Sequence, residues 1–144
     1  AASDVYKRQG VRKVLLLEEA WKAIAKEGMA SYVRYLFKTV RKYFGEAIVV
    51  TQEVEDIISS PIVKESIINN ADCKILLDQR KYRNKFDQIQ TLLGLTDKER
   101  AQVLSINLSN DPARRYKEVF ISLGGVQSAV YATEVSDEEY LVRP

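Results

Sequence analysis

Two adjacent carboxylates, Glu18 and Glu19, stand directly after the short apolar run 14–17. A run of this length bounded by polar residues is typical of a buried strand. Such a strand would hold the first carboxylate rigidly enough to bind Mg²⁺ through a water molecule, and the second could polarise a water that attacks a γ-phosphate. The pattern has the form of a Walker B motif. Acidic residues are also common in the first turn of any helix because they interact favourably with its dipole, so the pair alone leaves both interpretations open.

Polar residues also follow two further apolar runs. Gln52 comes after the run 47–50, and Asp78 and Arg80 come after the run 73–77. If the three runs are parallel strands of one sheet, their carboxyl ends meet at one edge, where ligands bind in open α/β sheets. The sequence therefore predicts that these polar groups converge with the two glutamates.

Amphipathic helices are predicted between these strands. From Ser31 onward apolar residues recur at spacings of three and four, and Gly45 stands where a helix stop belongs. Further helices are expected over 60–70, from about residue 84 to Gly94, and after the capping box that Thr96 makes with the residue three positions on. Alternation of strands and helices predicts an α/β fold with a parallel sheet.

The pattern changes towards the C-terminus. Strand-like segments at 118–123 and 126–135 flank Gly124-Gly125, which predicts a β-hairpin. Ser136 and the glutamate three residues later form another capping box.

The composition excludes several kinds of chemistry. The 144 residues include no histidine and a single cysteine, Cys73, so His-based triads and clustered-cysteine metal sites are ruled out. We expect Cys73 to pack as a small buried apolar residue. The net charge of +2, from 22 basic and 20 acidic residues, does not by itself indicate nucleic-acid binding.

Several segments together carry a family resemblance. The stretch 14–21, an apolar run followed by Glu-Glu-Ala-Trp, resembles the Walker B segment of type IV secretion motor ATPases, usually Asp-Glu-Ala-Trp. Residues 42–52 are similar to the family's next segment, in which a basic helix end leads into a strand closing with Thr-Gln, and 70–77 are similar to the strand after it. Residues 10–143 most resemble the TraG-type ATPase of conjugative transposons.

This resemblance implies a fold and a domain division. The fold would be a RecA-like P-loop NTPase of α/β class, a three-layer sheet that is incomplete, holding the Walker B half, with a C-terminal antiparallel β-hairpin. Residues 10–144 would be the C-terminal part of that ATPase domain. Residues 1–9 are expected to be a non-native leader, because 4–9 resemble the translated end of a transposase adapter used in sequencing libraries.

The resemblance also implies roles for individual residues, with ATP and Mg²⁺ as cofactors. Glu18 occupies the position of the Mg²⁺-linked acid, where the family more often has Asp. Glu19 would be the catalytic base, and Gln52 the sensor that contacts the γ-phosphate or the attacking water. Four residues are candidates for the arginine finger that a neighbouring subunit supplies: Arg41, Arg80, Arg114 and Arg115.

The implied function is that of a motor which hydrolyses ATP to drive transfer-channel assembly or substrate transport. The expected setting is a cytoplasmic homo-oligomer, a hexamer, peripheral at the inner membrane and in contact with secretion-channel proteins, with DNA left open as a partner. The sequence contains no Gly-x-x-x-x-Gly-Lys-Ser/Thr loop, so we expect this chain alone neither to bind ATP tightly nor to hydrolyse it. The alternatives are an FtsK/HerA-like DNA translocase and a non-catalytic α/β interaction module.

Overall fold

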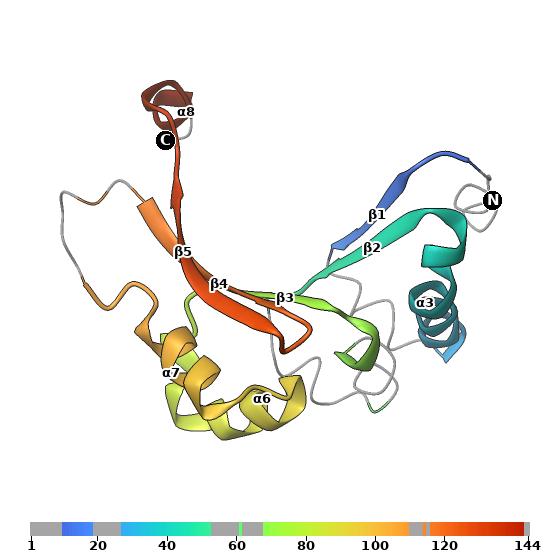
Figure 1. Cartoon of the computed structure of the whole chain (residues 1–144), viewed down its shortest axis with the longest axis horizontal. Coiled ribbons are helices and arrows are strands. Elements are labelled where there is room, and N and C mark those ends of the chain that lie inside the picture. Colours follow the sequence, from blue (N-terminus) through green and yellow to red (C-terminus); the bar gives the residue numbers. More distant parts are fainter. Residues whose placement is uncertain are drawn as a thin grey trace. The chain divides into compact units, whose positions relative to one another are not determined.

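The computed structural model describes most of the chain in two compact units. One unit lies within residues 1–71 and the other within 72–144, and each is described by itself (Figure 1). The described residues are 10–18, 27–52, 61, 68–109, 114 and 116–142. No helix among them is long and apolar enough to cross a membrane.

The first unit contains a pair of parallel strands. Strand β1 spans Lys13–Glu18 and strand β2 spans Gly45–Val50, and they align residue for residue over their whole length. Helix α3 (Glu27–Thr39) and the 3₁₀ helix η1 (Val40–Tyr43) come between them in the chain. The predicted strand–helix–strand order is therefore confirmed here, with the parallel pairing that such a crossover requires.

A small core lies between the helices and one face of this sheet. Leu36 of α3 and Val40 of η1 are buried, and Leu15, Leu17 and Ala47 pack against them. Alternate residues of β1 point to the other face, where Val14 and Leu16 are 63% and 60% exposed. The β1–β2 sheet thus has one packed face and one exposed apolar face.

The junction between η1 and β2 corrects one prediction. Phe44, not Gly45, takes the left-handed conformation that ends the helix, with φ 54°, and its N–H donates to the Arg41 carbonyl at 3.1 Å. Gly45 is the buried first residue of β2, and a Cβ there would lie 2.5 Å from Cγ2 of Val40. The expected role of Gly45 as helix stop is therefore wrong, and its small size serves close packing.

The second unit contains an antiparallel sheet in the order β3-β4-β5. Gly124 and Gly125 lie in the β4–β5 turn with positive φ angles of 56° and 73°, so the predicted hairpin is confirmed. The three strands span Cys73–Leu76, Tyr116–Leu123 and Gln127–Glu134.

Two local signals predicted from the sequence are confirmed in the helices of the second unit. Gly94 takes the left-handed conformation after α6, and Thr96 and Glu99 form the expected capping box at the start of α7. Helix α7 packs against β4 and β5. The helical elements of this unit are η3 (Arg80–Lys85), α6 (Phe86–Leu93), α7 (Asp97–Ser105) and α8 (Asp137–Val142), and a short 3₁₀ helix, η2 (Ile68–Asn70), belongs to the first unit.

Strand β3 differs from its expected setting. Among the described residues it pairs only with antiparallel β4, so its parallel alignment with β1 and β2 stays a prediction. Cys73 is exposed, and the expectation that it is buried is wrong. The register explains this, because Cys73 lies opposite the exposed Leu123, whereas Phe120 and Ser122 of β4 point to the buried side. The helix expected over 60–70 falls largely outside the described residues.

Candidate functional site

Glu18 and Gln52 lie at the same edge of the β1–β2 sheet. Glu18 is the last residue of β1 and stands in register with Val50, and Gln52 follows Val50 by two residues. Both side chains are exposed. Because the strands are parallel, this edge is the carboxyl edge at which α/β sheets bind ligands. Glu19, the predicted catalytic base, lies outside the described residues.

Strand β1 provides a firm support for Glu18. Leu15 and Leu17 precede Glu18 on this strand and point to the inner face. They pack against the buried core residues of α3 and η1. Glu18 itself alternates with Leu17 and so points to the face away from that core. An exposed carboxylate at the end of an ordered strand is a suitable hard oxygen ligand for Mg²⁺, directly or through water.

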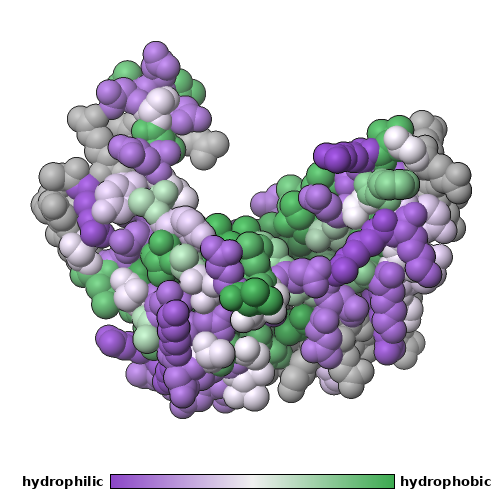
Figure 2. All heavy atoms as spheres, viewed as in Figure 1, coloured by the Kyte–Doolittle hydropathy of each residue, from purple (hydrophilic) through white to green (hydrophobic). Residues whose placement is uncertain are grey.

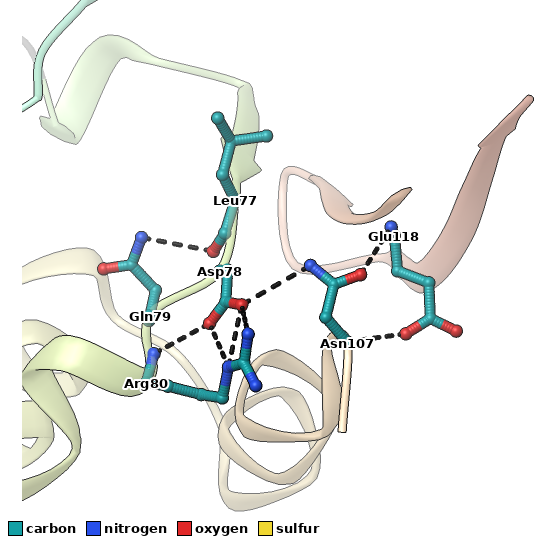
Figure 3. A network of polar contacts seen from close by, with 6 residues as sticks. All are labelled: Leu77, Asp78, Gln79, Arg80, Asn107 and Glu118. Atoms are coloured by element: carbon teal, nitrogen blue, oxygen red, sulfur yellow. Dashed lines mark hydrogen bonds and ion pairs between the residues drawn. The ribbon is translucent and has the colours of Figure 1, made fainter. Parts of the chain in front are cut away.

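A polar network lies where β3 ends and η3 begins (Figure 3). The carboxylate of Asp78 accepts two hydrogen bonds from Nε of Arg80, at 2.9 and 2.8 Å, and one from the Arg80 backbone N–H at 3.0 Å. The side-chain hydrogen bond from Arg80 is the main reason that the pKa of Asp78 lies below its usual value, and partial burial opposes it. The arginine candidate Arg80 is therefore held by a carboxylate of its own chain.

Asn107 joins this network to β4. Its backbone N–H donates to Oε2 of Glu118 at 2.7 Å, and its side-chain oxygen accepts from the Glu118 N–H at 3.0 Å (Figure 3). Its side-chain nitrogen donates to Asp78 at 3.5 Å. Asn107 has a positive φ of 55°, a conformation that Asn tolerates better than most residues. The network thus connects the end of β3, the turn after α7 and strand β4.

The other arginine candidates lie in different settings. Arg114 forms an ion pair with Glu118 at 3.3 Å, and its guanidinium lies 4.9 Å from the centre of the Tyr116 ring. Arg41 is exposed on η1 in the first unit. Arg115 lies outside the described residues. The structure thus holds Arg80 and Arg114 in contacts within the second unit.

Sequence reasoning identified the polar end of β3 but missed two members of its network. Asn107 lies far from Asp78 in the chain and contacts it only through the fold, and Glu118 joins the network through Asn107. The local signal available was weak: an Asn soon after a predicted helix, which is compatible with a left-handed residue.

Comparisons with known proteins agree with this architecture. The model of the TraG P-loop domain family matches residues 2–143. The type IV secretion system protein CagE of Helicobacter pylori is 33% identical over 90 residues, which cover 62% of this chain and 9% of CagE. The VirB4 structure from Thermoanaerobacter pseudethanolicus superposes with a TM-score of 0.67 at 24% identity, over 96% of this chain and 35% of that one.

These likenesses differ in what they establish. The VirB4 superposition confirms the α/β fold class expected of this type of ATPase. The chain spans about a third of VirB4 and about a tenth of CagE, the relatives that it matches. Because the family model covers almost the whole sequence, the chain belongs to the TraG P-loop domain family.

Proposed function

We propose that this chain is the Walker B part of the ATPase domain of a type IV secretion or conjugation motor. The observation that carries the proposal is the placement of Glu18 and Gln52 at the carboxyl edge of two parallel strands, in a chain that belongs to the TraG P-loop family. The similar proteins CagE and VirB4 support a role in secretion. In the longer motor, ATP hydrolysis would drive channel assembly or substrate transport.

The proposed chemistry runs on carboxylates. Glu18 would hold Mg²⁺ through a water molecule, and the ion, when bound, supplies positive charge beside the phosphate oxygens. Glu19 would accept a proton from water as the water oxygen bonds to the γ-phosphorus and the bond to the β-phosphate oxygen breaks. Gln52 would orient that water or the γ-phosphate by hydrogen bonding.

We further propose that a neighbouring copy completes the site with an arginine. For Arg80 or Arg114 to serve, the guanidinium would exchange its present carboxylate partner for a phosphate. The oligomer would lie at the inner membrane in contact with channel proteins, in keeping with the secretion role of the relatives.

ATP hydrolysis by the chain and by a longer protein tests this proposal. The 144-residue chain should show no turnover, because it lacks a phosphate-binding loop. A protein extended upstream to include such a loop should hydrolyse ATP, and Glu19→Gln in it should lower kcat by about 10²–10⁴-fold because the general base is lost. Glu46→Gln, at the opposite edge of the same sheet, is the matched control and should leave kcat unchanged.

Three results would contradict the proposal. ATP turnover by the chain alone that Glu19→Gln abolishes would show that it is active without further sequence. A parent protein without a phosphate loop would support the non-catalytic module. Hydrolysis that depends on added DNA would favour the DNA translocase.

A further inference from the structure

Helix α3 and the 3₁₀ helix η1 carry a row of cations on the side away from the sheet. The buried residues Val33, Leu36 and Val40 occupy the side towards the sheet. Figure 2 shows hydrophilic side chains gathered over α3. The four cations are all exposed and follow one another at spacings of four, three and one. They are Arg34, Lys38, Arg41 and Lys42.

Acidic residues are absent from the stretch of sequence that carries this row. Residues 28–45 contain no Asp or Glu. The side chains of Arg34, Lys38 and Lys42 make no hydrogen bond or ion pair with any residue that the structure describes. By contrast, Arg80, Arg100 and Arg114 in the second unit each contact a carboxylate. The row is therefore a concentrated positive surface.

Two aromatic side chains accompany the cations. Tyr35, next to Arg34 on α3, is 47% exposed, and Phe44, two residues after Lys42, is 66% exposed. The left-handed backbone at Phe44 is unusual for a residue of this size. Exposed rings beside a row of cations are the combination that binds single-stranded nucleic acid, because phosphates pair with the cations and bases stack on the rings.

The row ends far from the candidate catalytic edge. The Lys13 backbone N–H donates to the Phe44 carbonyl at 3.1 Å, and Lys13 Nζ donates to the Tyr43 carbonyl at 2.7 Å. The end of η1 is thus fixed at the amino end of β1, and Glu18 lies at the other end of that strand, about 17 Å away. A ligand at the η1 end of the row would leave the Glu18 edge open.

We propose that this basic face, Arg34, Lys38, Arg41 and Lys42 with Tyr35 and Phe44, binds single-stranded nucleic acid. An anionic membrane is the other polyanion to consider. The apolar side of α3, however, is packed on the sheet and is not available to enter a bilayer. The binding does not depend on ATP hydrolysis, so it can be tested independently of the proposed motor activity.

Fluorescence anisotropy with a labelled oligo(dT) strand and the 144-residue chain tests this site. With four cations engaged, log K should fall with log salt at a slope of about −3. The triple variant Arg34→Gln/Lys38→Gln/Lys42→Gln should reduce the slope to about −0.7 and weaken binding at low salt at least tenfold. Arg34→Lys keeps the charge and should retain most of the affinity.

A matched triple variant controls for the loss of net charge. Arg83→Gln/Lys98→Gln/Lys117→Gln removes three exposed cations from the second unit and should leave the affinity within about twofold. Circular dichroism of every variant shows whether the helices persist. Equal weakening by the two triple variants, both folded, would overturn the site.

A second pair of measurements tests the rings and the kind of polyanion. Phe44→Gly suits the left-handed backbone and should weaken oligo(dT) binding about fivefold or more, with little effect on duplex DNA. No effect of Phe44→Gly, or equal affinity for duplex, would overturn single-strand recognition. Sedimentation with phosphatidylcholine–phosphatidylserine vesicles, without binding of oligo(dT), would overturn the proposal in favour of a membrane surface.

Discussion

Glu99 is a carboxylate buried at the contact between α7 and the antiparallel sheet, with 5% of its surface exposed. Its oxygens accept hydrogen bonds from the Thr96 backbone N–H at 2.9 Å and from the Ser122 hydroxyl at 2.9 Å. Burial alone would raise the pKa of Glu99, but these hydrogen bonds together hold that pKa below its usual value. One side chain thus caps a helix and bonds it to β4.

Replacing Glu99 should therefore cost more than replacing an ordinary capping residue. Glu99→Ala should lower the free energy of unfolding by about 2–3 kcal/mol, because it removes a cap and leaves the buried Ser122 hydroxyl without its acceptor. Glu139 makes the same capping box with Ser136 on the exposed helix α8, so Glu139→Ala is the matched control and should cost about 0.5 kcal/mol. Urea unfolding measures both, and equal losses would contradict the special role of Glu99.

The same carboxylates should make stability depend on pH. The folded-state pKa values of Glu99 and Asp78 are lowered from ordinary values of 4.5 and 3.8. Their contribution is therefore complete above these values and is lost as the pH falls through the folded pKa values. The Tm should be nearly constant down to about pH 5 and fall below it, and Glu99→Gln should flatten that fall. An equally steep fall of Tm at acid pH in Glu99→Gln would contradict the prediction.

At the scale of helices and strands, prediction from the sequence succeeded where the signal is local. The stop at Gly94 and the capping box of Thr96 depend on neighbours within one turn, and both were predictable. The role of Gly45 was not predictable in this way, because it depends on the close approach of Val40, which arises only when η1 and β2 pack together. The register of β3 depends on its pairing with β4, about fifty residues away, so the residues around β3 in the sequence do not indicate it.

The candidate site likewise has one part that the sequence predicts and one part that it does not. The end of β1 at Glu18 and its alignment with the residues before Gln52 follow from short apolar runs, so the sequence was sufficient to place them. The network of Asp78, Asn107 and Glu118 requires three segments to meet, and only the fold brings them together. Long-range polar partners are therefore the part of the site that a single sequence does not specify.

The close contact at Gly45 gives a prediction about the junction of η1 and β2. Gly45→Ala should lower the free energy of unfolding by about 1–3 kcal/mol, because its Cβ would overlap Val40. In the double variant Gly45→Ala/Val40→Ala the overlap is removed, so the double loss should be smaller than the sum of the single losses. Strictly additive losses in urea unfolding would show that the two residues do not compete for space.

At the scale of the whole molecule, both sheets expose apolar side chains on one face. Val14 and Leu16 are exposed on the β1–β2 sheet, and Ile75 and Leu123 on the antiparallel sheet. Contiguous apolar surface of this kind promotes association in water. The isolated chain should therefore form concentration-dependent oligomers.

Substitution of these faces should reduce that association. Leu16→Glu/Ile75→Glu places a charge on each exposed face and should shift the mass measured by light scattering after gel filtration towards the monomer. Leu141→Glu, on the exposed helix α8 outside both sheets, is the control and should leave the mass distribution unchanged. A monomeric wild-type chain at all concentrations would contradict the prediction.

The parallel register of β1 and β2 also places unlike charges at the two ends of the sheet in the first unit. Lys13, Arg41 and Lys42 gather near the amino ends of the strands and outnumber Glu46 there, whereas Glu18 stands at the carboxyl end. In the field of a polyanion this separation of charge produces a torque, which turns the molecule before any contact forms. The unit would approach with its amino edge leading and its carboxylate edge trailing, so the orientation of a productive encounter is set at long range and weakens as salt shortens the screening length.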